Sequence, residues 1–504
     1  MKKAILIILT ISLILSNDGF YKDIFMDGGC DLYSHDFFYS ADSLGLEWEF
    51  LATETQSLQD AVFITNEWDQ NGILLYPDGE PRFRIIYTNG GSATNHGYSM
   101  GSDGRQAIRD FYYAGGSYTG SCAGAFISSL SYRETGTWTA YYHLWPGRTS
   151  STGLMDTPTG HDIEPDSPLL AYFDFGGDMY IDNVYHTGGC YANVSIDWPS
   201  ATEVLLRYDY PGRDMNDQPS SWAYKHNDES GRVVVIGSHP ENYENGERME
   251  LMGAILQYAI AGQGNPNIKA ALFPGEWRIM DRETSEDMPE YTKIGDKQYH
   301  HFTVDVPSDM PLLSIELDGE DGYHFNLYAK QGDFAFASTA DFADYSENSD
   351  KTLHIDFPES GTWYIGVELF TTVETTREDW GYDYTANQEV LDGLQYSIIA
   401  NLDSMTTVVE DNEINNADPI EIFPNPFYGR LKIRNLDRYQ LPANIEIFDQ
   451  NGRNIKTIDI ANSDGSVVWN GEDRQGKPLP TGIYLIRIQS KETFITRRVA
   501  LIRN

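Results

Sequence analysis

The sequence has few cysteines, few basic residues and, after its first segment, no long apolar run. Its 504 residues include only three cysteines, Cys30, Cys122 and Cys190, which are too few for a disulfide framework. The formal net charge is −41, from 35 Lys and Arg against 76 Asp and Glu. A nucleic acid is itself a polyanion and would be repelled, so we expect no nucleic-acid partner.

Only the amino-terminal segment is apolar enough to enter a membrane. Met1-Lys2-Lys3 and the apolar stretch from Ala4 to Leu15 have the length of a secretory signal peptide and are short for a membrane span. No other segment approaches about 18 consecutive apolar residues. We expect residues 1–17 to be a cleaved signal peptide and the mature chain to have no transmembrane span.

The length and the changes in pattern along the chain predict three domains. Residues 18–265 alternate apolar runs with helical stretches, which is typical of an α/β fold with a mostly parallel sheet. Residues 266–403 contain short strands with period-2 alternation, which predicts an all-β sandwich. An acidic linker at 404–418 leads to a second small β domain at 419–504, where 13 Lys and Arg outnumber nine Asp and Glu.

Several glycine-rich or reactive residues follow the predicted parallel strands. They are Gly28-Gly29, Gly90-Gly91, Cys122 and His239. Sites in such sheets collect beyond the carboxyl ends of the strands, so we expect a functional site at this edge.

Cys122 has the surroundings of a nucleophile elbow. It lies within Gly120-Ser121-Cys122-Ala123-Gly124, between an extended segment and an apolar helix. A sharp strand-to-helix turn demands small residues around the nucleophile. The helix amino terminus also favours a thiolate. A buried structural cysteine is the alternative.

Far downstream, Ser238-His239-Pro240-Glu241 follows the apolar run Val233 to Gly237. Cysteine, histidine and carboxylate are the nucleophile, the base and the group that orients the base. We therefore predict a Cys122–His239–Glu241 triad, with His239 moving the proton. The backbone N–H of Ala123 and one from Gly90 or Gly91 would form an oxyanion hole.

Other histidines and cysteines receive weaker predictions. His186, with Gly188 and Gly189, is predicted either to form a substrate-facing loop or to be structurally bonded. His96 and His161 are placed in polar loops without a functional role. No cluster has metal-ligand spacing, so neither a metal nor another cofactor is predicted. A Cys30–Cys190 disulfide is left open.

The first domain resembles the class I glutamine amidotransferase-like superfamily, most closely the amino-terminal domain associated with some biotin–protein ligases. The matching residues are Asn89-Gly90-Gly91, Gly115 to Tyr118, Gly120 to Ala125, Thr187 to Gly189 and Ser238 to Glu241. The resemblance implies a flavodoxin-like fold and the same triad. The sequence departs from amidotransferases at Ala125-Phe126-Ile127, where a glutamine is usual, and it contains neither a synthetase nor a ligase domain.

The two β domains carry their own resemblances. The middle domain is similar to the pre-peptidase C-terminal domains, which are β-sandwich modules of secreted peptidases. The matching residues are Tyr299 to Phe302, Phe325 to Tyr328 and Gly361 to Tyr364. The carboxylates of this domain leave Ca²⁺ binding as an open alternative to a solvated surface.

The last region resembles the C-terminal sorting domain of type IX secretion substrates. The matching residues are Phe423 to Phe427, Phe448 to Arg453, Trp469 to Asp473 and Thr481 to Tyr484. This resemblance implies that residues 419–504 engage the secretion machinery and that the protein is secreted or held on the outer cell surface.

Two functions follow from the sequence. The first is a secreted cysteine hydrolase that cleaves a peptide or another amide through a thioester. The alternative is a non-catalytic surface protein that keeps the fold and binds a peptide or glycan.

Overall fold

The computed structural model describes residues 19–27, 38–50, 72–194, 198–286, 288–378, 381–403, 421–434, 436, 443–449, 453–460, 466–489 and 494–503. The chain divides into two compact units, Met1–Met405 and Thr406–Asn504. Across these described ranges, no helix is both long and apolar enough to cross a bilayer. The predictions for Gly28-Gly29, Cys30 and the linker fall outside the described residues.

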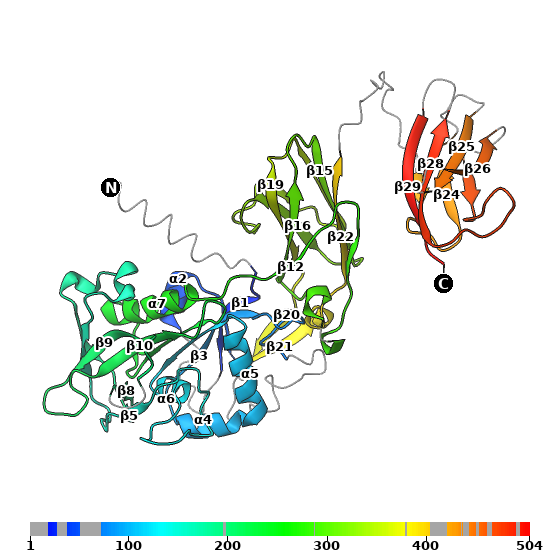
Figure 1. Ribbon diagram of the computed structural model, residues 1–504. Helices are drawn as coiled ribbons and strands as arrows, with labels where there is room; N and C mark the ends of the chain where they lie inside the picture. Colours follow the sequence, from blue (N-terminus) through cyan, green and yellow to red (C-terminus); the bar gives the residue numbers. More distant parts are fainter. Residues whose placement is uncertain are drawn as a thin grey trace. The chain divides into compact units, whose positions relative to one another are not determined.

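The first unit opens with one large sheet and its helices (Figure 1). Their order along the chain is β1 (Lys22–Met26), α2 (Tyr39–Leu44), β2 (Trp48–Phe50), β3 (Phe83–Thr88), α4 (Ala93–Ser99), α5 (Gly101–Tyr113), β4 (Ser117–Ser121), α6 (Ala123–Ser128), β5 (Thr149–Ser151), β6 (Thr159–Ile163), β7 (Tyr180–Val184), β8 (Cys190–Ala192), β9 (Glu203–Asp209), β10 (Pro219–Lys225), β11 (Arg232–Ile236) and α7 (Glu247–Ile260).

The sheet has nine strands in the order β2-β1-β3-β4-β11-β10-β9-β6-β7. The first five are parallel to their neighbours. The remaining pairings, from β11–β10 to β6–β7, are antiparallel. The sheet is therefore mixed, whereas the sequence predicted a mostly parallel one.

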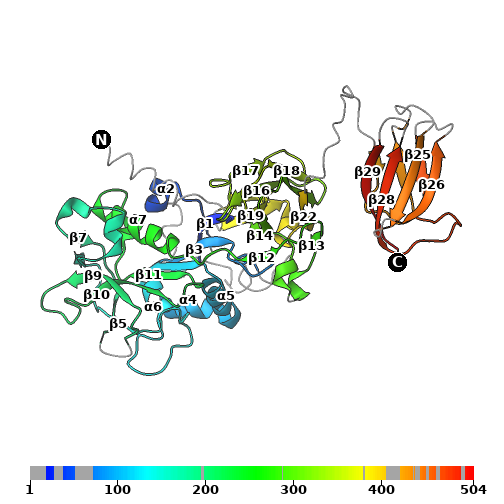
Figure 2. The same cartoon turned by 45° about the horizontal axis from the view of Figure 1, so that its top comes forward.

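Side chains of the parallel strands alternate between two apolar cores, as the pleat requires. Phe25 and Val235 face the core that contains α5 and α6, and Ile24 and Val234 face the core that contains α2 and α7. Figure 2 shows these two groups of helices on opposite sides of the sheet. Both faces of β1, β3, β4 and β11 are thus covered, which explains the apolar runs within β1, β3 and β11.

The rest of the first unit is a β-sandwich. One sheet has the order β12-β14-β19-β16-β17 and the other the order β13-β22-β15-β18. The strands are β12 (Ile268–Ala271), β13 (Arg278–Met280), β14 (Tyr299–Val306), β15 (Leu312–Gly319), β16 (Phe325–Gln331), β17 (Phe342–Asp344), β18 (Lys351–Asp356), β19 (Gly361–Leu369) and β22 (Tyr396–Asp403), with a separate hairpin of β20 (Glu374–Glu378) and β21 (Gly381–Ala386).

The sandwich and the large sheet share buried polar contacts. The Arg82 guanidinium, just before β3, donates to both carboxylate oxygens of Asp296 at 2.9 Å. Arg82 also donates to the Tyr384 hydroxyl of β21 at 3.2 Å, and that hydroxyl donates to Glu49 of β2 at 2.9 Å. Bidentate Arg–carboxylate pairs fix geometry strongly, so the two parts of this unit are tightly joined.

The second unit is also β-rich. Its sheets have the orders β23-β24-β27 and β26-β25-β28-β29, with a shared core that includes Phe427, Trp469 and Ile486. The strands are β23 (Glu421–Phe423), β24 (Leu431–Arg434), β25 (Ala443–Asp449), β26 (Asn454–Ile460), β27 (Val467–Trp469), β28 (Gly482–Gln489) and β29 (Phe494–Leu501). The molecule as a whole is mostly β.

Candidate active site

Cys122 occupies a strained turn between β4 and α6. Its backbone has φ 49° and ψ −100°, a conformation that non-glycine residues rarely adopt. A Cβ on Gly124 would lie 2.2 Å from the Thr88 carbonyl oxygen, and one on Gly120 would lie 2.7 Å from Gly124 Cα. The small residues around Cys122 are therefore required by close backbone contacts.

The neighbouring strand β11 brings His239 to the same edge of the sheet. β11 is parallel to β4, with Ile236 opposite Ser121. The backbone N–H of Cys122 donates to the Ile236 carbonyl at 2.9 Å. The chain then turns through Gly237 and Ser238 to reach His239, so both predicted residues lie where two adjacent strands end.

Glu241 is held by two hydrogen bonds at this edge. Its Oε1 lies 2.8 Å from His239 Nδ1 and accepts a hydrogen bond from the Ser121 hydroxyl at 2.7 Å. Ser121 in turn lies 3.0 Å from the Tyr87 hydroxyl of β3. Residues from three neighbouring strands thus fix the carboxylate that orients His239.

The electrostatic surroundings of His239 favour the imidazolium. Burial opposes its charge, but the Glu241 carboxylate and the Cys122 side chain outweigh burial and raise the pKa of His239 to about 11. Its Nε2 is buried and makes no hydrogen bond within the described part of the chain. This nitrogen is therefore free to exchange a proton with a neighbouring group.

The loop between β7 and β8 covers the thiol. Cys122 Sγ donates to the Thr187 carbonyl oxygen at 3.4 Å, and the cysteine is only 4% exposed. The Tyr185 carbonyl accepts from the His239 backbone N–H at 2.8 Å. The Tyr185 ring lies 5.6 Å from the His239 ring. Main-chain atoms of this loop therefore contact both the sulfur and the histidine.

His186 is hydrogen-bonded inside the protein. Its side chain is fully buried; Nε2 lies 2.7 Å from the Thr152 hydroxyl and Nδ1 lies 3.1 Å from the Ser238 hydroxyl. Burial and the nearby His239 lower the pKa of His186 to about 4. The structure corresponds to the alternative of a bonded histidine that holds the loop.

The two glycines of this loop have different roles. Gly188 has φ +68°, a left-handed conformation. A Cβ on Gly189 would lie 1.9 Å from the Gly237 carbonyl oxygen. Gly189 thus allows the loop to approach the turn that carries His239.

The predicted placement of His161 and His96 in polar loops was wrong, because both lie in regular elements. His161 is buried in β6, with Nδ1 2.8 Å from Ser220 and Nε2 3.2 Å from Ser238. His96 is buried in α4, 3.0 Å from Asp27. The alternation Thr159, His161, Ile163 is the period-2 signal that would have identified the strand.

The predicted oxyanion residues lie at the same edge. Ala123 is the first residue of α6. Gly90 is in contact with the imidazole, since a Cβ there would lie 2.4 Å from His239 Cε1. Sequence reasoning did not anticipate this contact. Gly91 has φ +125°.

Among the described residues, no group of three or more His, Cys, Asp or Glu side chains is arranged so that it could hold a metal ion. Cys190 is buried in β8, and burial raises the pKa of its thiol. Its proposed partner Cys30 lies outside the described part.

Comparisons with known protein families match two segments of the chain. Residues 298–369 match the bacterial pre-peptidase C-terminal domain, and residues 421–502 match the secretion system C-terminal sorting domain. These residues are therefore a pre-peptidase-type β-sandwich and a type IX sorting domain. The sorting domain implies an interaction with the secretion machinery and a location outside the cell or on its outer surface.

Other comparisons are less informative. No curated protein matches the chain. Among solved structures, it is similar to PorZ of Porphyromonas gingivalis, with 21% identity over 22% of this chain and 14% of that one, and a TM-score of 0.15. The pre-peptidase C-terminal domain of a Bacillus anthracis collagenase is matched along 100% of its length, with 13% identity over 27% of this chain and a TM-score of 0.17. At these scores, no function of this chain follows from them.

Proposed function

We propose that the protein is a secreted cysteine hydrolase that cleaves an amide bond, and that residues 18–265 are a class I glutamine amidotransferase-like domain with a flavodoxin-like core. One observation carries the proposal. A cysteine in a strained strand-to-helix turn lies beside a His–Glu pair that follows the adjacent parallel strand. Backbone strain of this kind persists where the surrounding structure imposes it, often at active sites.

The proposed reaction has two steps. The Cys122 thiolate attacks the amide carbonyl, and the His239 imidazolium gives its proton to the departing amine, which leaves a thioester. His239 then takes a proton from water, and the resulting hydroxide hydrolyses the thioester. Glu241 keeps the imidazole oriented throughout.

The developing oxyanion needs donors near the sulfur. The backbone N–H of Ala123 and one from Gly90 or Gly91 are the proposed donors. Loss of one such donor typically lowers the rate by about 10²–10³. Glutamine-dependent amide transfer is not proposed, because Ala125-Phe126-Ile127 departs from the amidotransferase pattern.

The alternative is a surface protein that binds a peptide or glycan without catalysis. One observation favours it, namely that the thiol is almost fully covered and donates to the Thr187 carbonyl. Catalysis then requires the loop between β7 and β8 to move.

A screen of peptides and small amides with the mature protein tests the proposal. We expect hydrolysis by the wild type, trapping of an acyl-enzyme on Cys122 by mass spectrometry, and no product from Cys122→Ala. His239→Ala should abolish acylation while leaving the circular dichroism spectrum unchanged. Turnover that survives in either variant would rule out the triad, and absence of any thiol reactivity would favour the binding protein.

A further inference from the structure

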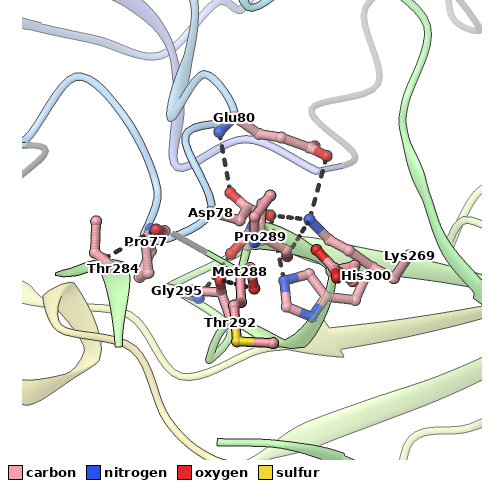
Figure 3. Close-up of polar contacts among 12 residues, drawn as sticks. Pro77, Asp78, Glu80, Lys269, Thr284, Met288, Pro289, Thr292, Gly295 and His300 are labelled. Atoms are coloured by element: carbon pink, nitrogen blue, oxygen red, sulfur yellow. Dashed lines mark hydrogen bonds and ion pairs between the residues drawn. The ribbon is translucent and has the colours of Figure 1, made fainter. Parts of the chain in front are cut away.

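A second cluster of ionisable side chains lies where the large sheet meets the sandwich, away from Cys122. It contains Asp78 and Glu80, from the turn before β3, and Lys269, His300 and Gln298, from β12 and from the start of β14 (Figure 3). The turn is closed by hydrogen bonds from Tyr76 N–H to the Glu80 carbonyl at 2.8 Å and from Gly79 N–H to the Tyr76 carbonyl at 2.9 Å. The proposed cysteine chemistry uses none of these residues.

Lys269 and Asp78 are in direct contact and shielded from water. Nζ of Lys269 donates to Oδ2 of Asp78, and their side chains are 5% and 0% exposed. Glu80 Oε1 lies 3.5 Å from the same Nζ, and the Pro289 carbonyl also lies 3.5 Å from it. An amine and a carboxylate are thus held together beside a second carboxyl group.

The two oxygens of Asp78 have different partners. Oδ1 accepts the backbone N–H of Glu80 at 3.0 Å. Oδ2 accepts from Gln298 Nε2 at 2.6 Å and lies 3.4 Å from His300 Nε2. Donors therefore surround the oxygen nearest the lysine, while the other oxygen is held by the main chain.

Burial opposes both charges of the Lys269–Asp78 pair, but each charge stabilises the other, which raises the pKa of Lys269 and lowers that of Asp78. The ammonium therefore needs a neighbouring base before Nζ can react. Burial and the charge of Asp78 outweigh the attraction of Lys269 and raise the pKa of Glu80 to about 7. Burial lowers the pKa of His300 to about 4, so its ring is neutral near pH 7. At neutral pH Glu80 exchanges a proton readily, as a group that takes one from the ammonium must.

We propose that Lys269 and Asp78 form an intramolecular amide bond. Glu80 takes one proton from the Lys269 ammonium, and the neutral Nζ attacks Cγ of Asp78. The Cγ–Oδ2 bond breaks, and Oδ2 leaves as water with two protons that came from the lysine, one of them returned by Glu80. Ammonium and carboxylate thus become amide and water, so atoms and charge balance without a further reactant.

Two features favour this condensation over the ion pair. Reacting groups held in contact gain effective molarities of about 10⁵–10⁸ M, and a buried site keeps water from reversing the step. A small cavity lined by Glu80, Pro81, Asn267 and His301 adjoins the cluster. The cavity offers a place for the released water.

Peptide mapping of the full mature protein tests the proposal. Digestion with trypsin and a second protease should yield a branched peptide that joins the segments containing Asp78 and Lys269. This peptide should be lighter than the two segments together by one water. A digest in which trypsin cleaves after Lys269 in all of the protein would overturn the proposal without bearing on Cys122.

Variants separate the roles of the residues. Lys269→Met should abolish the branched peptide, whereas Lys293→Met, which removes a half-buried lysine paired with Glu283, should leave it unchanged. Glu80→Gln should lower the cross-linked fraction at least about tenfold at early times after synthesis. Unchanged cross-linking in Glu80→Gln would contradict the proton transfer assigned to Glu80.

Discussion

Among single residues, Glu241 has the largest influence on the charge of His239. Glu241→Gln keeps a polar group beside Nδ1 but removes the negative charge that raises the pKa of His239. With less imidazolium present, we expect alkylation of Cys122 by iodoacetamide at about pH 6 to slow by about tenfold or more. The rate of carbamidomethylation, followed by mass spectrometry, measures this without a substrate.

A carboxylate nearby provides the control for that variant. Glu244 accepts from the exposed Tyr39 hydroxyl at 3.2 Å and makes no contact with His239 that the structure records. Glu244→Gln should therefore label at the wild-type rate. Equal rates for wild type and Glu241→Gln would show that Glu241 does not control the site.

Gly90 is a second residue with a sharp expectation. Gly90→Ala places a methyl carbon 2.4 Å from His239 Cε1, which is too close for non-bonded atoms, so the imidazole has to move. We expect thiol labelling and any amide hydrolysis to fall by about 10²-fold, because small displacements in a site have effects of this size. Gly253→Ala in α7, whose added carbon would have its nearest neighbour at 3.4 Å, should leave both unchanged. A Gly90→Ala protein with wild-type rates would contradict the contact.

The sequence anticipated some residues of the site but not the contacts between them. Cys122 and His239 could be placed together because each follows a run typical of a parallel strand, and such strands end at one edge. The bonds of Ser238 to His161 and His186 join three distant segments. No local pattern encodes such a network, so it could not be predicted.

At the scale of elements, the two halves of the large sheet differ in how far sequence reveals them. β11 reads Arg-Val-Val-Val-Ile and is buried on both faces, as its continuous apolar run indicates. β10 is buried almost throughout but reads Pro-Ser-Ser-Trp-Ala-Tyr-Lys. Its serines bond inside the sheet, Ser221 to the Val235 carbonyl at 2.8 Å and Ser220 to His161. The polar residues of β10 therefore gave no sign in the sequence that this segment is a buried strand within the sheet.

The antiparallel half of the sheet carries a pH-dependent element. Burial lowers the pKa of His161 in β6 to about 3. A histidine whose pKa is depressed in the folded state contributes its full stability at pH values above its ordinary pKa. That contribution is lost progressively as the pH falls below the ordinary pKa, because the unfolded chain then binds the proton and the folded chain does not. We expect the free energy of unfolding to fall by about 2 kcal/mol because of His161 when the pH is lowered from 6.5 to 5. Urea unfolding followed by tryptophan fluorescence measures this.

A substitution identifies the histidine responsible. His161→Gln cannot gain a proton, so its unfolding free energy should change less over this pH range than that of the wild type. His226→Gln, at an exposed position between β10 and β11, should follow the wild type. Identical pH slopes for wild type and His161→Gln would rule out this explanation.

At the scale of the whole molecule, the second unit determines where the protein goes. Removal of residues 421–502, the sorting domain, should leave the protein inside the outer membrane. Among the described residues, the apolar cluster of this unit contains only residues of the unit itself. Cell fractionation and immunoblotting measure the outcome.

A matched variant keeps this experiment specific. Cys122→Ala should reach the cell surface in wild-type amounts, because it alters the first unit alone. Surface delivery of the truncated chain would show that another segment directs export. The strand patterns of both β domains were visible in the sequence, whereas the single compact unit formed by residues 1–405 was not.

Arg82 is hydrogen-bonded to Asp296 and Tyr384, and Tyr384 is hydrogen-bonded to Glu49. These contacts bear on how the mature protein withstands proteolysis outside the cell. In the Lys269→Met protein, which cannot form the proposed amide, a protease that nicks the exposed connection around Asn265 severs the covalent link between the two parts but leaves these buried contacts intact. The two fragments should then co-elute in gel filtration as one particle. The sandwich would thus stay bound to the large sheet after cleavage instead of dissociating from it.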